Sequence, residues 1–294
     1  MPDDAAARAA AEEESAFAHP AVDPDATAAY GSHPDQVIDF YAPRAGDGVV
    51  PDRSVPLVVV VHGGAWRAPY DRRHITPFAD FLARRGFAVA VVEYRRGTAV
   101  PVQGESPVAG RWPETFDDLA AAWDALPTLV RDALPQADSR RTVLTGHSAG
   151  GHLALWAAAR HVLPADSPWR TARPAQLRGV VALAPIADFR VAEQLDVCSG
   201  AVLQLLGGKD HFEDRLPYAD PVTLLPTGIA TALVQGRTDT EVPHAVAESY
   251  AEAAARAGEV VGLTLLEDVG HYALIDPTAD ACAVVAEEIA QLAW

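Results

Sequence analysis

The fold of this chain is decided by the stretch Thr142-Val-Leu-Thr-Gly-His-Ser-Ala-Gly-Gly-His-Leu-Ala-Leu-Trp156. It begins as a β-branched strand, passes through the pattern Gly-x-Ser-x-Gly at Gly146–Gly150, and continues into an apolar helix. A strand, a tight turn and a helix are the context that this pattern requires. Glycine at both flanking positions leaves room for a turn whose central residue has a strained backbone. We therefore predict that Ser148 is a nucleophile held between a strand and a helix.

Short apolar runs of the same kind recur along the chain on both sides of this turn. The strand candidates are Leu57–Val61, Phe87–Val92, Thr142–Thr145, Gly179–Ala184, Thr231–Gln235 and Gly262–Leu266. Continuous apolar character without alternation is typical of strands that are covered on both faces. An earlier strand candidate, Gln36–Tyr41, and a short strand before Pro56 suggest a hairpin ahead of them.

Amphipathic helical periods fill the gaps between these runs. Apolar residues repeat at spacings of three and four from Ile75, Phe116, Leu153, Val246 and Val285. Alternation of strands and helices predicts an α/β fold with a mostly parallel sheet of about eight strands, flanked by helices. In such a sheet the ligand site lies outside the carboxyl ends of the strands.

Three parts of the chain depart from this alternation. Residues 1–29 are rich in Ala, Asp and Glu and are expected to form an N-terminal arm that could be flexible, ahead of a catalytic domain at residues 30–294. Residues 186–225 carry weak helical patterns and predict a small insertion that resembles a lid. Residues 95–113 are irregular, as binding loops beside strand ends often are.

Composition excludes several classes of function. With 294 residues, 49% of them hydrophobic, the chain suits one globular domain with a large core. The net charge, 23 − 40 = −17, repels phosphate backbones, so we predict no nucleic-acid partner. No apolar run approaches the roughly 18 residues of a membrane span, and the acidic N-terminus is unlike a secretory signal, so a cytoplasmic location is expected. Cys198 and Cys282 lie far apart without the spacing of metal ligands, which predicts free thiols and no metal site.

A second motif, His62-Gly-Gly-Ala-Trp66, directly follows the strand Leu57–Val61. Attack by a serine hydroxyl places negative charge on the carbonyl oxygen of the substrate, and backbone amides can hold that charge. We predict that the amides of Gly64 and Ala65, together with that of Ala149, form this oxyanion hole. His62 precedes the nucleophile along the chain and is expected to orient the loop rather than to act as the base.

The acid and the base are expected after the later strands. Asp239 follows the strand Thr231–Gln235 and is the predicted acid, although an Asp there could also cap a turn or helix, and Glu241 is the alternative carboxylate. Two histidines follow Asp239. His244 falls inside the next helix and would face solvent, whereas His271 lies in the loop after the last strand and is the predicted base.

The resulting order, Ser148, Asp239, His271, is that of the α/β-hydrolases. The chain resembles serine esterases of this superfamily, close to the hormone-sensitive-lipase-like and kynurenine-formamidase-like branches that carry the HGGxW form. The likeness runs from about Tyr30 to the C-terminus. The matching residues are Tyr30 to Pro34, Asp39, Tyr41, Pro43, His62 to Trp66, Gly146 to Gly151, Ala219 to Pro221, Leu224 to Pro226, Asp239 to Pro243, Gly270 and His271.

The resemblance implies a carboxylesterase that acts on small to medium esters through an acyl-enzyme and needs no metal or organic cofactor. Alternatives within the superfamily are an arylformamidase that cleaves N-formylkynurenine, and an acyl or peptide hydrolase. From another class, the alternative is a catalytically silent binding protein with the same fold. Trp66, Trp112, Phe189 and Phe212 are candidates to line the pocket, but core packing is the favoured interpretation for each of them, so they are not assigned to the site. The natural substrate, the stereochemical preference and the oligomeric state stay open.

Overall fold

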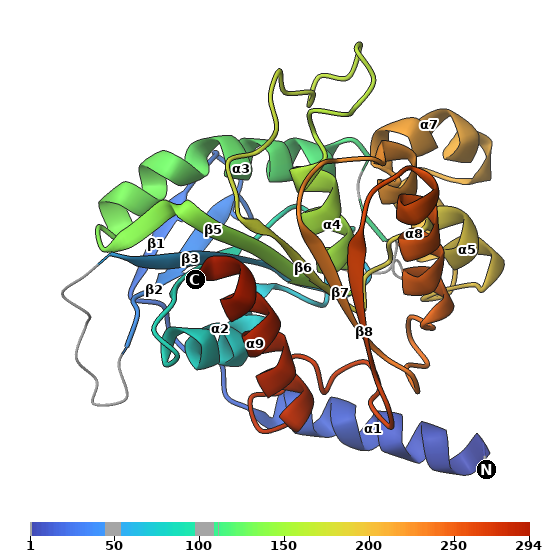
Figure 1. Cartoon of the computed structure of the whole chain (residues 1–294), viewed down its shortest axis with the longest axis horizontal. Helices are drawn as coiled ribbons and strands as arrows, with labels where there is room; N and C mark the ends of the chain where they lie inside the picture. The colour runs from blue at the N-terminus through green and yellow to red at the C-terminus, as the bar shows by residue number, and fades with distance from the viewer. Residues whose placement is uncertain (1, 45–53, 98–108, 111) are drawn as a thin grey trace.

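The computed structural model describes residues 2–44, 54–97, 109–110 and 112–294. These residues form one sheet of eight strands in the order β1-β2-β4-β3-β5-β6-β7-β8 (Figure 1). The strands are β1 Ala26–Ala29, β2 Val37–Tyr41, β3 Val55–Val61, β4 Ala88–Val92, β5 Ala137–His147, β6 Gly179–Leu183, β7 Thr231–Gly236 and β8 Val261–Leu266. All pairs from β4 to β8 are parallel, and β2 pairs antiparallel with both β1 and β4. The predicted α/β fold is confirmed.

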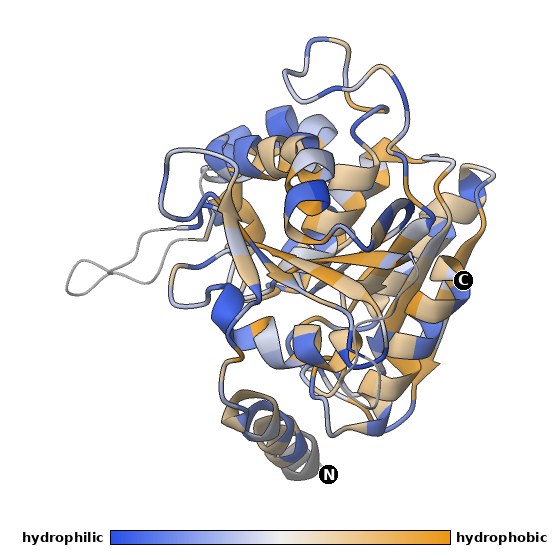
Figure 2. Cartoon of the chain, turned by 90° about the vertical axis from the view of Figure 1, so that its left-hand side faces the viewer, coloured by the Kyte–Doolittle hydropathy of each residue, from blue (hydrophilic) through white to orange (hydrophobic). Residues whose placement is uncertain are grey.

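Helices cover both faces of this sheet. On one face lie α3 (Glu114–Ala133), α4 (Ala149–Ala158) and α8 (Ala245–Arg256), and on the other lie α2 (Thr76–Ala83) and α9 (Asp280–Ala293) (Figure 1). In Figure 2 the strands between these layers are largely apolar, whereas polar residues concentrate on the outer helical surfaces and loops.

Strand β3 shows why the central runs contain almost no polar residues. All seven of its side chains are buried. Leu57, Val59 and Val61 belong to the core beneath α3 and α4, and Val58 and Val60 to the core beneath α2 and α9. Because successive side chains point to opposite faces, a strand covered on both sides needs apolar residues at every position.

The antiparallel end of the sheet corrects one prediction. The hairpin at the start of the fold is formed by β1 and β2, whereas the segment before Pro56 is the first part of the parallel strand β3. Thus residues 26–29, expected in the arm, form an edge strand of the sheet. The sequence of β1 is Ala-Thr-Ala-Ala, and its residues alternate between half-buried and exposed. An edge strand with such small side chains carries little apolar signal.

The arm begins with a helix, α1 (Pro2–Ala18), which crosses the bottom of the view in Figure 1, below α9 and the loop after β8. Its contacts with that loop are described below. Of the irregular stretch predicted at residues 95–113, residues 98–108 and 111 lie outside the described residues. No helix in the described part of the chain combines the length and the apolar character needed to cross a membrane.

The insertion at residues 186–225 consists of short helices that pack against the domain. They are α5 (Phe189–Gln194), α6 (Ala201–Leu205) and α7 (Phe212–Ala219), with 3₁₀ turns at Lys209–His211 and Pro221–Leu224; a further 3₁₀ turn, Arg72–Ile75, precedes α2. Phe189, Leu205 and Phe212 are buried in the same core as α3 and α4. The lid-like insertion therefore shares the core of the domain.

Candidate active site

Ser148 lies in a strained turn between the carboxyl end of β5 and the start of α4. Its φ angle is 57° and its ψ angle −120°, and the residue is 3% exposed. A Cβ atom at Gly146 would lie 2.2 Å from the carbonyl oxygen of Gly150, and a Cβ atom at Gly150 would lie 2.1 Å from that of Val61. Since backbone atoms cannot yield as side chains do, both positions require glycine. The turn thus has the geometry that the Gly-x-Ser-x-Gly pattern predicts.

Asp239 and His271 are joined directly. Oδ2 of Asp239 lies 2.7 Å from Nδ1 of His271. Its other oxygen, Oδ1, accepts hydrogen bonds of 2.8 Å from each of the backbone amides of Glu241 and Val242. The carboxylate is thereby fixed in the loop after β7 while it holds the imidazole of the loop after β8.

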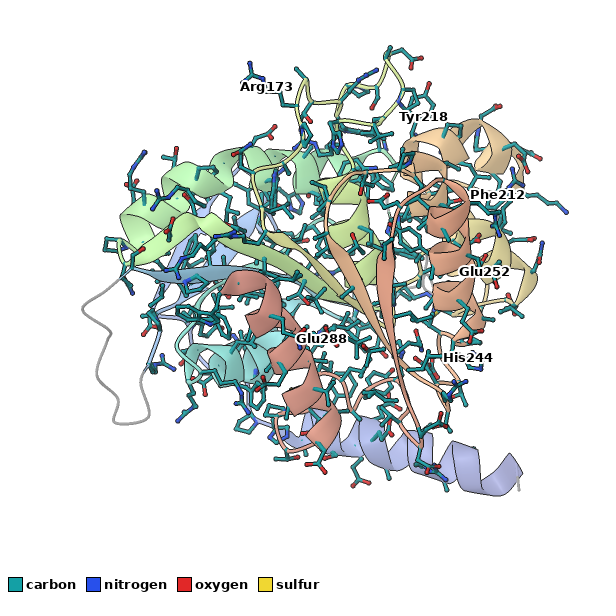
Figure 3. The ribbon with its side chains drawn as sticks, in the orientation of Figure 1. Arg173, Phe212, Tyr218, His244, Glu252 and Glu288 are labelled. Carbon is teal, nitrogen blue, oxygen red and sulfur yellow. The ribbon has the colours of Figure 1, made fainter. Side chains whose placement is uncertain are left out.

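The two alternatives to these residues lie elsewhere. Glu241 lines the cavity described below, yet its side chain makes no hydrogen bond to His271 among the described contacts. His244 pairs with Glu248 at 3.1 Å and its side chain is 37% exposed. Figure 3 places it at the surface where α8 begins. Asp239 and His271 are therefore the carboxylate and the histidine that the fold brings together.

The electrostatic surroundings of His271 favour its protonated form. Burial by itself lowers the pKa of the imidazole, but the charge and hydrogen bond of Asp239, with weaker effects from Glu241 and Glu12, outweigh burial and raise the pKa above 6.5. The ring of His147 lies 4.4 Å from that of His271, and burial and this neighbour hold the pKa of His147 far below its usual value. At neutral pH, His147 is thus uncharged, and its Nε2 lies 2.9 Å from the backbone oxygen of His271.

Ser148 and His271 face the same cavity, which has a volume of about 170 Å³ and is called the Ser148 cavity below. Its lining also includes Phe17, Gly64, Ala65, Tyr70, Cys198, Glu241 and Tyr272. Among the described contacts no hydrogen bond joins the Ser148 hydroxyl to His271. In sites without substrate such bonds are often long and shorten when the complex forms.

The loop that carries Gly64 and Ala65 lies against the serine turn. A Cβ atom at Gly63 would lie 2.8 Å from the carbonyl oxygen of His147. Gly64, Ala65 and Trp66 have φ angles of 102°, 50° and 55°. Within the described residues, no protein group accepts a hydrogen bond from the amides of Gly64 or Ala65, and Ala149, as the first residue of α4, has no partner inside its helix. In the part of the chain that the structure describes, these three amides therefore have no protein acceptor.

A buried carboxylate, Glu93, fixes this loop at both ends, and the sequence analysis did not identify it. Its Oε1 lies 2.8 Å from Nε2 of His62, and its Oε2 accepts a 2.9 Å bond from the amide of Arg72. Arg96 forms an ion pair with the same carboxylate. Burial alone would raise the pKa of Glu93, but His62 and Arg96 outweigh it and lower the pKa to about 2. A lone acid at the end of the apolar run Phe87–Val92 was the signal available in the sequence.

His62 has the orienting position that the sequence predicts. Its ring is fully buried, Nδ1 lies 2.9 Å from the Gly63 carbonyl oxygen, and Tyr94 stacks on it with the ring centroids 4.4 Å apart. With both ring nitrogens engaged, His62 connects the loop to Glu93 and cannot serve as the base for Ser148.

Core packing, the favoured interpretation of the four candidate pocket aromatics, is confirmed. Trp66 and Phe189 are fully buried, Phe212 belongs to the same core, and Trp112 packs at its border. The Ser148 cavity is instead lined by Phe17, Tyr70 and Tyr272. Large aromatic residues near a site are more often used to fill the core, which is what the first four do.

The cysteines are free thiols, as predicted. Cys198 lines the Ser148 cavity, and burial raises the pKa of its thiol to about 12. A thiol with this pKa stays protonated near neutral pH and is a weak nucleophile. Cys198 therefore contributes shape to the cavity rather than reactivity.

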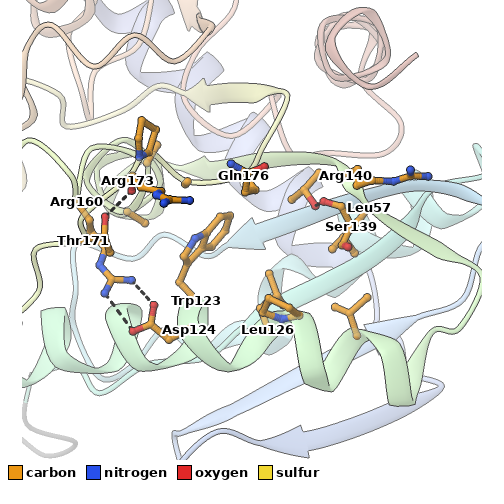
Figure 4. A pocket seen from close by; sticks show the side chains of 17 residues that line it. Leu57, Trp123, Asp124, Leu126, Ser139, Arg140, Arg160, Thr171, Arg173 and Gln176 are labelled. Carbon is orange, nitrogen blue, oxygen red and sulfur yellow. Dashed lines mark hydrogen bonds and ion pairs between the residues drawn. The ribbon is translucent and has the colours of Figure 1, made fainter.

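A larger cavity, whose lining is drawn in Figure 4, has a volume of about 520 Å³ and lies beside the amino end of β5, whereas Ser148 follows the carboxyl end of that strand. It lies between α3, the start of β5 and residues 171–176, and its lining includes Trp123, Leu126 and Arg140. None of the predicted site residues lines it. Because ligands of such sheets bind at the carboxyl ends of the strands, the smaller Ser148 cavity is the candidate active site.

Together, the fold and the site define a serine hydrolase of the α/β-hydrolase superfamily. The BD-FAE family model matches residues 38–253, more than half of the chain. The chain belongs to this family.

Relatives of known structure share the fold at low sequence identity. Esterase B from Lactobacillus rhamnosus superposes with a TM-score of 0.72 at 19% identity, over 97% of this chain and 91% of that one. A truncated carbohydrate esterase from gut microbiota gives a TM-score of 0.70 at 18% identity, over 93% and 99%. Dipeptidyl peptidase family member 6 from Caenorhabditis elegans is 26% identical over 80% of this chain and 31% of its own length. The chain spans between 4% and 31% of the curated relatives it matches.

Proposed function

We propose that this BD-FAE family member is a serine carboxylesterase that cleaves small to medium carboxylic esters. The observation that carries the proposal is the 2.7 Å contact between Asp239 and His271 in a cavity shared with the strained Ser148. In this proposal Ser148 is the nucleophile, His271 the base, Asp239 the acid, and the amides of Gly64, Ala65 and Ala149 the oxyanion hole.

The proposed reaction has two steps. The Ser148 oxygen bonds to the ester carbonyl carbon while Nε2 of His271 takes the hydroxyl proton. The carbonyl electrons move to the oxygen, which the three amides hold, and then return as the bond to the alcohol breaks; the alcohol leaves with the proton from His271. Water then attacks the acyl-enzyme by the same route and releases the carboxylic acid.

The walls of the Ser148 cavity support a small, uncharged substrate. Its volume of about 170 Å³ suits a short acyl or alcohol group, and Phe17, Tyr70 and Tyr272 supply apolar ring surface. Glu241 and Arg67, which carry opposite charges, both line the cavity, so the charge of its walls favours neither an anionic nor a cationic ester. The substrate class that fits these walls is a neutral carboxylic ester.

The domain limits belong to the same proposal. We place the catalytic domain at residues 30–294, with the lid-like insertion at 186–225, and extend it to include residues 26–29 of the arm, which form the edge strand β1 of its sheet. A cytoplasmic location stays a prediction, supported by the two free thiols.

The test compares substrates of the competing functions. Initial rates are measured with p-nitrophenyl esters of increasing acyl length, N-formylkynurenine, a formanilide and a dipeptide p-nitroanilide. A preference for short esters supports the proposal. Preference for N-formylkynurenine or the formanilide would indicate an arylformamidase, and preference for the dipeptide p-nitroanilide would indicate a peptidase. A protein that turns over none of them and gains no mass from a fluorophosphonate would be a silent binding protein.

The basicity of His271 predicts the pH dependence of the reaction. Only the neutral imidazole can accept the Ser148 proton, and the surroundings raise its pKa above 6.5. We therefore expect kcat/KM for p-nitrophenyl acetate to be constant at alkaline pH and to fall tenfold per unit as the pH drops below this raised pKa. The rate is followed at the isosbestic wavelength of p-nitrophenol, so that ionisation of the product does not distort the profile. A profile that is flat down to pH 5 would contradict the role of His271.

A further inference from the structure

Helix α1 is fastened to the segment that carries His271. Four side chains of residues 8–19 reach this segment across more than 250 positions of sequence. The contacts are Arg8 to Asp268 at 2.9 Å, Glu12 to the amide of Gly270 at 2.9 Å, Ser15 to Asp276 at 2.5 Å and His19 to Asp276 at 2.9 Å. Phe17 of the same helix end lines the Ser148 cavity. The N-terminal helix is therefore part of the surroundings of the site.

We propose that Glu12 is a positioning residue for His271, acting through the backbone amide of Gly270 and through its negative charge. The inference rests on the proposed function, in which His271 is the base. It assigns a role to one residue of α1, a helix for which the sequence analysis predicts no function.

The first support for this role is how Gly270 and Glu12 fit together. A Cβ atom at position 270 would lie 2.4 Å from Oε2 of Glu12. The absence of a side chain there leaves the space that the carboxylate occupies, one residue before the imidazole. Oε1 of Glu12 accepts the Gly270 amide, while Oε2 is buried without a hydrogen-bond partner among the described residues. Burying an oxygen without a hydrogen-bond partner costs free energy, and an interaction between the Glu12 charge and His271 would account for that cost.

The second support is the way the His271 backbone is held. The backbone amide of Gly270, the preceding residue, donates to Glu12, and the backbone carbonyl oxygen of His271 lies 2.9 Å from Nε2 of His147. The ring is held by Asp239. Loss of the Glu12 contact would free the backbone on one side of His271, so the imidazole would spend less time in reach of Ser148. A displacement of this kind lowers kcat more than it raises KM.

The third support is the charge around the imidazole. The titratable groups that face it are Asp239 and Glu241 from the loop after β7, His147 from β5, Tyr272 beside it and Glu12 from α1. His147 is neutral near pH 7, so the charges are three carboxylates. Each stabilises the protonated imidazole and raises its pKa. Neutralising Glu12 must therefore lower the pKa of His271 and move the acid limb of the rate profile to lower pH.

The experiment separates the two effects of Glu12. Glu12→Gln keeps an oxygen that can accept the Gly270 amide but removes the charge, whereas Glu12→Ala removes both. We expect the acid limb of kcat/KM to move down by about 0.5 pH unit in both variants. In Glu12→Ala we also expect kcat to fall about tenfold with little change in KM. The matched control is Glu14→Gln, the same change at an exposed position of the same helix.

Gly270→Ala tests the same contact from the other side. Because the atom it would meet is the end of a flexible side chain, the new methyl group should displace the Glu12 carboxylate without unfolding the loop. We expect the same fall in kcat as in Glu12→Ala, and no further fall when the two changes are combined.

The proposal is overturned if Glu12→Gln and Glu12→Ala follow the pH profile of Glu14→Gln, even when their melting temperatures fall, because a purely structural anchor would behave in that way. Additive losses in the Glu12→Ala, Gly270→Ala double variant would also overturn it. Failure of the proposed function would be seen before Glu12 is changed. In that case the wild-type protein would not hydrolyse the esters, or the Ser148→Ala variant would hydrolyse them at the wild-type rate.

Discussion

Replacement of Ser148 by alanine is expected to lower kcat by about 10⁴-fold or more. The acyl-enzyme cannot form without the hydroxyl. His271 and Asp239 act only together with Ser148, so they cannot replace its contribution. The fold should persist, since alanine keeps the Cβ atom that Ser148 already places at a φ of 57°. The measurement is kcat with p-nitrophenyl acetate, with the melting temperature as the check on folding.

A second serine on the wall of the same cavity provides the matched control. Ser199 lines the Ser148 cavity and is the other serine of that wall. Ser199→Ala should keep both the esterase rate and the mass increase produced by a fluorophosphonate, and Ser148→Ala should lose both. If Ser148→Ala turned over the ester at the wild-type rate, the assignment of the nucleophile would be wrong.

Asp239→Asn is expected to lower kcat by about 10⁴-fold at neutral pH. Oδ1 of the new side chain can still accept from the amides of Glu241 and Val242, which leaves the NH₂ group facing His271. An NH₂ group is a donor, so the imidazole would have to turn Nδ1 into an acceptor and carry its proton on Nε2. That tautomer cannot accept the Ser148 proton.

Glu241→Gln distinguishes the two carboxylates of the loop after β7. Glu241 makes no hydrogen bond to His271 among the described contacts, so we expect this variant to keep kcat within a few-fold of the wild type. A large loss in Glu241→Gln together with a small loss in Asp239→Asn would reverse the assignment of the acid.

The central fold could be predicted because it depends on signals that are local in sequence. A strand covered on both faces must be apolar throughout, as β3 is, and a turn as tight as that of Ser148 requires glycine at fixed positions. Ser148, Asp239 and His271 could then be predicted to lie at one edge of the sheet, because each of them comes after the carboxyl end of a predicted strand. The contact between Asp239 and His271 fits that expectation.

The features that were missed depend on contacts between distant parts of the chain. Glu12 and Gly270 are 258 positions apart, and neither residue type signals a contact with the other. Glu93 is a single acid whose partners, His62 and Arg72, come from a separate loop. Phe17 was missed for the same reason, because the sequence does not show that α1 brings this ring to the cavity.

The buried carboxylate of Glu93 holds the oxyanion-hole loop of the proposed mechanism in place as soon as the chain has folded. It fixes the glycine-containing loop at His62 on one side and Arg72 on the other, so in the proposed mechanism the amide dipoles of Gly64 and Ala65 are held at the cavity wall before substrate arrives. Water molecules would have to reorient as charge builds up on the carbonyl oxygen, whereas these dipoles do not. The free-energy cost of dipole reorientation is thus met once, when the chain folds, and is absent from every later catalytic cycle.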